Sequence, residues 1–186
     1  MIQQGARIVL TAVLGLGVVC ARAADPDDWT QPAEVTHDLK RCLSYRARLS
    51  GSFLVLEARI EAGWHTFAMD NRQRAAEKLQ GKKALSQDLP TEIRVSGGLE
   101  IDGPWFQSVP RDFSRPQLRW FSWGFEDRAL FVTRIRRTGA EPARITIGGQ
   151  VCTDTTCRKV DLVISLPIKA AGTGEIDLNP LIQVRR

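Results

Sequence analysis

The sequence predicts an all-β domain, built as an antiparallel sandwich or barrel. Most of the chain alternates apolar and polar residues with a period of two, which is typical of half-buried strands. The alternating runs are short, and Gly, Pro, Asp and Ser separate them, as expected for turns between antiparallel strands. The strand–helix alternation that marks a parallel sheet is absent from the sequence.

The alternating runs are the expected strands. They cover residues 39–49, 53–60, 93–95, 99–101, 130–135, 143–151 and 160–168. The ends of the domain carry weaker signals. We expect residues 25–36 to be a loose lead-in and residues 170–186, which contain two glycines and a proline, to be a loosely packed tail.

One segment has a different composition. Residues 71–80 (NRQRAAEKLQ) are rich in helix formers, with Asn71 in the N-cap position and Gly81 as a stop. A helix of about ten residues is marginal by itself, so we expect a short surface helix or an ordered loop insertion. Its basic residues are expected to form a solvated face.

Residues 104–125 are unusually aromatic. They hold three of the five Trp, four Phe and three Pro, without clean periodicity. Because Pro110 and Pro116 disfavour a continuous central strand, we expect a long aromatic loop folded over another part of the molecule. The alternative is that these rings fill one end of the core.

The first 23 residues have the pattern of a secretory signal peptide. Arg7 precedes an apolar run over residues 8–20, and residues 21–23 match an A-x-A cleavage pattern. The apolar run is shorter than the roughly 20 residues of a membrane-spanning helix. Cleavage after Ala23 is therefore expected, and an uncleaved anchor is the alternative.

The composition is that of an ordinary globular domain. The chain has 186 residues, of which 43% are apolar and 25% charged, which excludes general disorder. We expect residues 24–186 to form a single domain, with a core at about 35–170, in the periplasm or another extracytoplasmic compartment. The net charge of +5 is too small to imply nucleic acid without a basic stripe, and no stable membrane span is expected after signal cleavage.

The most informative segment joins the last two expected strands. Cys152 and Cys157 flank four small polar residues that suit a tight turn. Directly opposed residues on paired strands lie about 4.5–5.5 Å apart, within the Cα separation of about 4.4–6.8 Å found in disulfides. The two cysteines are therefore placed to bridge across a hairpin.

The spacing of the pair leaves three uses open. A structural bridge is common in exported proteins, although a six-residue loop gains only about 2 kcal/mol from it. A redox pair suits two neighbouring sulfurs at an accessible turn, where an outside thiolate can attack. A zinc or copper site is the weakest interpretation because the second Cys/His pair of zinc frameworks is missing.

Charged residues close to the pair bear on its chemistry. Arg158 and Lys159 follow Cys157 directly and are expected to favour its thiolate, whereas Asp154 opposes them. Cys42 is the remaining thiol of the mature chain. Alternation places it on a polar face, exposed or at a sheet edge, and a small buried hydrophobe is the simpler interpretation.

Four short motifs follow one another along the chain: GWHTF at residues 63–67, LPT at 89–91, the run from Phe125 to Ile135, and QVCTDTTC at 150–157. In this order they resemble the N-terminal periplasmic domain of the thiol:disulfide interchange protein DsbD. The likeness covers roughly residues 35–170.

This resemblance implies an immunoglobulin-like β-sandwich that passes electrons between thioredoxin-like proteins, as a thiol-disulfide oxidoreductase-like carrier without a cofactor or metal. Cys152 and Cys157 would be the redox pair. Cys157 would form mixed disulfides with partners, and Cys152 would resolve them. The resemblance also associates the chain with cytochrome c assembly.

In the same family an aromatic cap loop shields the redox pair. By position the cap falls within residues 111–123, which makes Phe113, Trp120 or Phe121 the expected cap residue. The sequence departs from the family where Arg158-Lys159 replaces a common Pro-Pro. No membrane or thioredoxin-like domain follows in the sequence, so we expect the reductant to be another protein. The competing hypothesis is a non-catalytic binding module with a structural hairpin disulfide.

Overall fold

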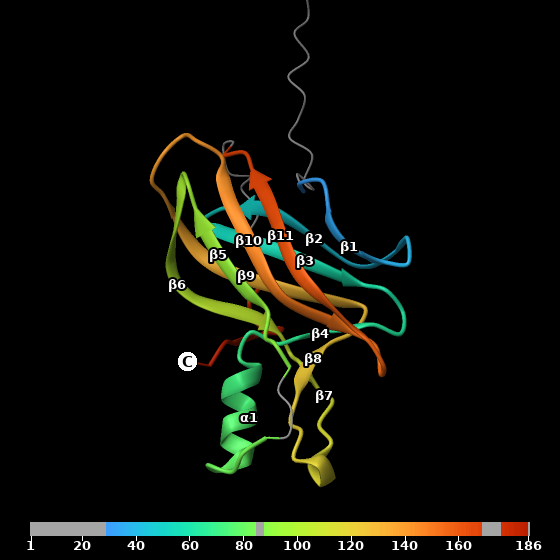
Figure 1. Ribbon diagram of the computed structural model, residues 1–186. Coiled ribbons are helices and arrows are strands. Elements are labelled where there is room, and N and C mark those ends of the chain that lie inside the picture. Colours follow the sequence, from blue (N-terminus) through green and yellow to red (C-terminus); the bar gives the residue numbers. More distant parts are fainter. Residues whose placement is uncertain (1–28, 85–87, 169–175, 186) are drawn as a thin grey trace, which may run out of the picture.

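Two antiparallel sheets stack face to face in the computed structural model, which describes residues 29–84, 88–168 and 176–185 (Figure 1). The expected signal peptide, residues 1–23, lies outside the described residues. The elements are β1 (Ala33–His37), β2 (Lys40–Ser50), β3 (Phe53–Ile60), β4 (His65–Phe67), α1 (Asn71–Leu79), β5 (Glu92–Ser96), β6 (Leu99–Ser108), β7 (Arg111–Asp112), the 3-10 turn η1 (Pro116–Leu118), β8 (Trp123–Phe125), β9 (Arg128–Arg137), β10 (Ala143–Cys152), β11 (Cys157–Leu166) and β12 (Leu181–Gln183).

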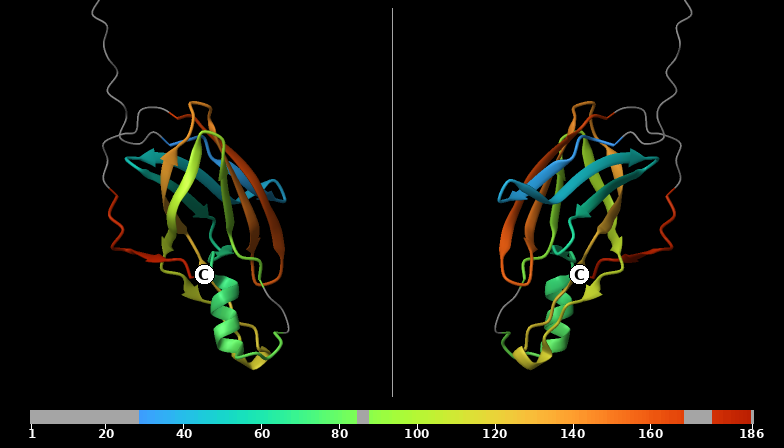
Figure 2. Two further views of the ribbon diagram at one scale, coloured as in Figure 1. Left: turned by 90° about the vertical axis from the view of Figure 1, so that its left-hand side faces the viewer. Right: turned by 90° about the vertical axis from the view of Figure 1, so that its right-hand side faces the viewer.

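The strand order defines the sandwich. One sheet runs β1-β2-β3-β9-β6-β12, and the other runs β11-β10-β4-β8-β7, with β5 also paired to β10. Every pairing is antiparallel. The side views show the two layers edge-on (Figure 2). The immunoglobulin-like β-sandwich with one short helix is confirmed.

The core lies between the sheets, where the alternating apolar residues predicted it. Tyr45, Leu56 and Phe131 come from one sheet, Ile145 and Ile147 from the other, and all are almost completely buried. The Tyr45 and Phe131 rings lie 6.2 Å apart between centroids. Burial of such side chains is the main force that holds the two layers together.

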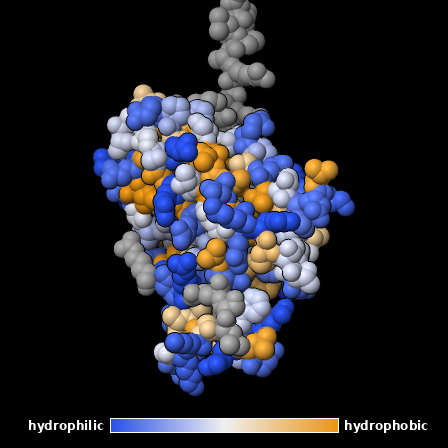
Figure 3. Space-filling view, in the orientation of Figure 1, coloured by the Kyte–Doolittle hydropathy of each residue, from blue (hydrophilic) through white to orange (hydrophobic). Residues whose placement is uncertain are grey.

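The short helix is confirmed, but it begins differently from the prediction. Asp70, not Asn71, is the residue before the first turn, and Asn71 is buried as the first helical residue. The Asn71 amide instead ties the loop at Asp88 to the start of β8: Nδ2 donates to the Asp88 carbonyl (3.2 Å), and Oδ1 accepts from the backbone N–H of Trp123 (2.7 Å). The lower end of the molecule, where α1 lies, shows mostly hydrophilic residues (Figure 3). No helix within the described residues is long and apolar enough to cross a membrane.

Both ends of the domain are more ordered than expected. Within the predicted loose lead-in, β1 pairs with β2. Within the predicted loose tail, β12 pairs with β6, so this part of the tail is an edge strand of the sandwich. Runs of three to five residues carry too little periodicity to be recognised, and the backbone pairing with a longer strand forms them.

The aromatic stretch 104–125 is only partly a loop. Trp105 and Phe106 lie in β6, and Trp123 and Phe125 lie in β8, where both are buried in the core. Both interpretations of this stretch therefore hold in part. Trp123 and Phe125 fill part of the core, and residues 113–122 form the connection between β7 and β8.

Asp70 connects the helix, the sheet and the C-terminal strand. Its Oδ1 accepts from Arg74 Nε (2.8 Å) and from Gln107 Nε2 (2.7 Å), and its Oδ2 accepts from the backbone N–H of Arg185 (3.3 Å). Burial alone would raise the pKa of Asp70, but these hydrogen bonds outweigh it and hold the pKa below its usual value of 3.8. The ionised form is therefore the one that the fold stabilises.

We predict that Asp70→Asn lowers the free energy of unfolding by about 2 kcal/mol at pH 7, the size of hydrogen bonds to a buried charged group. A lowered folded-state pKa stabilises the fold above the unfolded pKa, and this stabilisation disappears as the pH falls through the folded value. Urea unfolding of both proteins at pH 7 and at pH 3 checks this. If the difference in unfolding free energy between the two proteins is the same or larger at pH 3 than at pH 7, the prediction is wrong.

Candidate functional site

The two predicted cysteines close the β10–β11 hairpin. They are the last cross-strand pair of the ladder, with Cα atoms 4.0 Å apart, and they form a disulfide. Thr153 shapes the turn beyond them: its N–H donates to the Thr156 carbonyl (2.8 Å), and its Oγ1 accepts from the N–H groups of Thr155 and Thr156. The small polar residues between the cysteines therefore make the tight turn that the sequence predicted.

The two cysteines of the disulfide differ in solvent exposure. Cys152 is only 2% exposed, whereas Cys157 is an exposed residue. An outside thiolate must approach a disulfide sulfur directly. Approach from the side of Cys157 is therefore less hindered by the protein than approach from the side of Cys152.

A cavity of about 340 Å³ lies against the disulfide. One wall is the hairpin itself, and the opposite wall is residues 113–122, here called the cap hairpin. The cap hairpin protrudes beyond β7 and β8 (Figure 1). Backbone hydrogen bonds from Phe113 to Ser122 and in both directions between Arg115 and Trp120 hold its two arms together.

Aromatic and ionic contacts join the cap hairpin to the disulfide hairpin. The Phe113 ring stacks on His65 with centroids 4.9 Å apart, and His65 is the cross-strand neighbour of Cys152. At the turn, Arg115 Nη2 lies 3.7 Å from Asp154 Oδ1. The cap hairpin thus contacts both the strand and the turn that carry the cysteines.

Asp88 adds a buried polar link that the sequence did not reveal. The residue is 5% exposed, and its carboxylate accepts hydrogen bonds from Trp120 Nε1 (2.7 Å, to Oδ2) and from Gln150 Nε2 (3.0 Å, to Oδ1). Trp120 belongs to the cap hairpin and Gln150 to β10. One carboxylate therefore holds the cap hairpin to the strand that carries Cys152.

His65 sits between two aromatic rings beside the bridge. Phe113 stacks on one side, and Phe67 meets the ring edge-on with centroids 5.3 Å apart. Burial lowers the pKa of His65 below its usual 6.5, with Arg115 acting in the same direction, and the charges of Asp88 and Asp154 only partly oppose this. The imidazole is therefore neutral at pH 7.

The structure separates the three expected cap residues. Phe113 and Trp120 line the cavity. Phe121 is not among the lining residues and packs against the hydrophobic core instead. Side-chain alternation along the second arm of the cap hairpin explains the difference, since neighbouring residues point to opposite sides.

The charged residues after Cys157 are engaged elsewhere. Arg158 donates from Nε to His37 Nδ1 (2.8 Å), and Lys159 Nζ lies 2.8 Å from Asp161 Oδ2. Asp154 is paired with Arg115, as described above. Lys159 and Asp154 are therefore held in ion pairs, whereas the hydrogen bond of Arg158 to an imidazole nitrogen leaves its positive charge next to Cys157.

Cys42 is buried, which confirms the simpler of its two interpretations, a small buried hydrophobe, and rules out the exposed position. The residue is 1% exposed, and its Sγ donates to the Val35 carbonyl of β1 (3.1 Å). Burial raises the pKa of the Cys42 thiol. β1, which the sequence did not predict, covers this side of β2.

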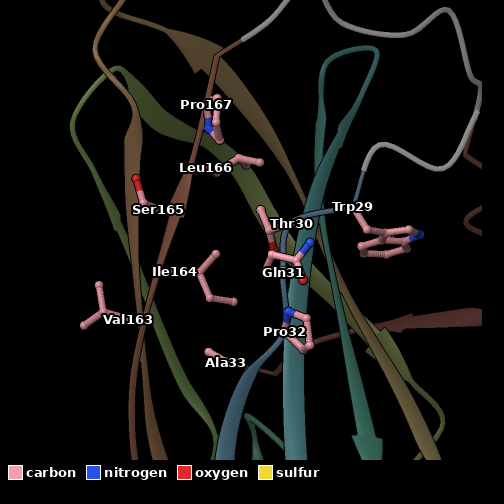
Figure 4. Close-up of a pocket in the computed structure, with 10 residues that line it drawn as sticks. All are labelled: Trp29, Thr30, Gln31, Pro32, Ala33, Val163, Ile164, Ser165, Leu166 and Pro167. Atoms are coloured by element: carbon pink, nitrogen blue, oxygen red, sulfur yellow. The ribbon is translucent and has the colours of Figure 1, made fainter. Parts of the chain in front are cut away.

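Two further features of the described residues concern other possible sites. In the part of the chain that the structure describes, no group of three or more His, Cys, Asp or Glu residues could hold a metal ion. A larger hollow of about 460 Å³ lies between residues 29–33 and residues 163–167 (Figure 4), and none of its lining side chains is ionisable or nucleophilic beyond hydroxyl groups.

Comparisons with known proteins agree with this fold. No family model matches the sequence, and no curated protein matches it significantly. The structure is similar to the N-terminal periplasmic domain of ScsB from Proteus mirabilis, with a TM-score of 0.52 and 15% identity over 73% of this chain. The chain spans 50% of that protein's length.

Two structures from Neisseria meningitidis are more distant. They are the reduced DsbD N-terminal domain (TM-score 0.39, 9% identity, covering 75% of this chain and 87% of that one) and the complex of the DsbD and PilB N-terminal domains (0.42, 10% identity, 72% and 87%). These scores are too low to support an inference. The fold of this chain is thus similar to that of the ScsB N-terminal periplasmic domain, and in this chain a cysteine bridge lies at the end of the β10–β11 hairpin.

Proposed function

We propose that this chain is an extracytoplasmic thiol-disulfide exchange domain. The observation that carries the proposal is the asymmetric bridge: an exposed Cys157 is joined to a buried Cys152 beside a cavity that the cap hairpin partly covers. Exposure of one cysteine does not make a structural disulfide more stable, whereas an exchange reaction requires an accessible sulfur.

The exchange runs in two displacements. A partner thiolate attacks Sγ of Cys157, a new intermolecular disulfide forms, and Cys152 leaves as a thiolate that takes up a proton. The partner's second thiol then loses its proton and attacks the partner's first sulfur in the mixed disulfide. Cys157 leaves as a thiolate, which takes up a proton. The bridge gains two electrons and two protons, and the partner dithiol becomes a disulfide. In the opposite direction, Cys157 attacks the partner and Cys152 resolves the intermediate.

The charged residues around Cys157 modulate this reaction. Arg158 and Lys159 raise the local positive potential, which favours the Cys157 thiolate, and Asp154 lowers that potential. The ion pairs of Lys159 with Asp161 and of Asp154 with Arg115 moderate both effects.

The cap hairpin controls access to the bridge. Partner approach over the cavity requires that the Phe113–His65 stack, the Arg115–Asp154 pair and the Trp120–Asp88 hydrogen bond give way. Each of these contacts is modest in energy. A docking partner can therefore displace the cap hairpin, while in the free domain it hinders stray oxidants.

The partners that this chemistry suits are thioredoxin-like proteins, whose paired thiols complete both displacements. The association with cytochrome c assembly has no support from the structure or the comparisons and stays a prediction. The competing hypothesis, a binding module with a structural bridge, differs in redox potential. Titration against glutathione or dithiothreitol separates the two, since structural bridges lie below about −300 mV.

We predict that Cys152→Ala traps a partner through Cys157. The probe is a thioredoxin whose second active-site cysteine is serine and whose first is activated as a thionitrobenzoate disulfide. The Cys157 thiolate attacks the thioredoxin sulfur and releases thionitrobenzoate, and without a resolving thiol the covalent complex persists. Absorbance of the released group and non-reducing electrophoresis measure the reaction.

Cys157→Ala is the matched variant and should react much more slowly, because Cys152 is buried. Cys42→Ala in the Cys152→Ala background should not change the yield. A faster reaction of Cys157→Ala would reverse the two roles, and no complex with either variant would remove exchange with thioredoxin-like partners.

We also predict that Trp120→Phe loosens the cap hairpin. The change removes the Nε1–H donor to Asp88 and keeps an aromatic ring. The closed position of the cap hairpin therefore loses about 1 kcal/mol of stabilisation. Alkylation of the reduced protein by iodoacetamide should accelerate about fivefold at Cys157. Trp105→Phe, on β6 and outside the cavity, is the control, and equal rates in both variants would show that the hydrogen bond does not restrain the cap hairpin.

A further inference from the structure

A cluster of arginines lies on the sheet that does not carry the disulfide. Arg46 of β2, Arg59 of β3 and Arg128 of β9, here called the arginine triad, converge on the carboxylate of Glu57. Their strand neighbours on the other face, such as Ala47 and Ala58, point into the core. The triad therefore lies on the outer face of the sandwich.

The contacts of Glu57 with the three arginines are made through their Nε atoms. Its Oε2 accepts from Nε of Arg46 and from Nε of Arg59 (3.0 Å), and Arg128 Nε lies 2.6 Å from Oε1. Among the described residues, no hydrogen bond from the Nη groups of the triad is found. Each guanidinium carries five N–H donors, so most donors of the triad are left for another acceptor.

The charges of this cluster do not balance. Glu57 supplies one negative charge for three guanidiniums. Burial alone would raise the pKa of Glu57, but the arginines outweigh burial and lower the pKa, so the carboxylate is ionised. Arg59 and Arg128 are direct cross-strand partners, an arrangement that like charges disfavour. A second anion between the arginines would relieve this repulsion.

The space for such an anion is present. The triad lines a hollow of about 400 Å³ together with Arg48, Trp29, Glu57 and Asp127. The Trp29 ring lies under two guanidiniums, 4.4 Å from Arg46 and 4.9 Å from Arg48. Stacking on an aromatic ring holds a guanidinium plane in place, which lowers the entropy cost of binding a ligand. Asp127 is the opposing charge, and it forms no ion pair with the triad among the described residues.

We propose that this hollow binds a phosphate group. Several guanidinium forks around a small hollow match the geometry and charge of a tetrahedral oxyanion, free or on the headgroup of a larger molecule. The site lies in the other sheet from the cysteines and does not depend on the proposed thiol chemistry.

The test is a titration of the full mature chain with inorganic phosphate, followed through the Arg Nε–Hε signals in ¹⁵N NMR. We expect saturable shifts of the triad that sodium chloride at equal ionic strength does not reproduce. Arg59→Gln and Arg128→Gln should each weaken binding about tenfold. Arg136→Gln, which alters an exposed arginine paired with Glu100 at the far end of β9, is the matched control and should bind as the unaltered protein does.

A second arm separates the sources of the phosphate. Sedimentation with phosphatidylcholine vesicles that do or do not contain phosphatidic acid shows whether a lipid phosphate binds, again compared between Arg59→Gln and Arg136→Gln. Binding of either phosphate that depends on the triad supports the site and identifies its source. Binding of neither, or equal losses in Arg136→Gln, would overturn it, and thermal melts confirm that each variant is folded.

Discussion

The register between β10 and β11 is the constraint on which the site depends. Ten consecutive cross-strand pairs run from Ala143 with Leu166 to Cys152 with Cys157, without a bulge. A slip of one residue would turn every side chain to the opposite face and separate the sulfurs. β10 also pairs with β4 and β5, so partners on both of its edges hold the register. At Gly149 (φ +138°) a Cβ would lie 2.8 Å from the Pro90 carbonyl oxygen, so a residue larger than glycine would clash with the Pro90 backbone.

The sequence predicted the long strands and the cysteine hairpin because both are local patterns. Alternation extends over enough residues in β2, β3, β9, β10 and β11 to reveal them, and the cysteines lie next to the turn that pairs them. The strands β4, β7, β8 and β12 have two or three residues each, too few for a period to be visible. They exist because a neighbouring strand offers hydrogen bonds. For the same reason the predicted loose tail forms an edge strand.

The remaining site residues were hidden by their separation along the chain. Asp88 bonds to Gln150, 62 residues away, and to Trp120, 32 residues away, and no spacing rule reports such contacts. The sequence places His65 only within the GWHTF motif of residues 63–67. Its place beside Cys152 follows from the pairing of β4 with β10. The aromatic content of residues 104–125 predicted a loop folded over another part of the molecule, and the resemblance to the DsbD N-terminal domain implied its role as a cap. Neither could distinguish Phe121, which packs on the core, from Phe113 and Trp120, which line the cavity.

The burial of Cys42 has a consequence for the redox chemistry of the whole domain. The three cysteines of the described residues permit three different pairings, and an accessible third thiol would compete for the bridge in each round of the proposed exchange. Cys42 is sealed beneath β1 with a thiol that resists ionisation, so it is kinetically isolated from that competition. In the proposed exchange reaction, the buried Cys42 thiol would therefore not pair with Cys152 or Cys157 while the hairpin disulfide is open.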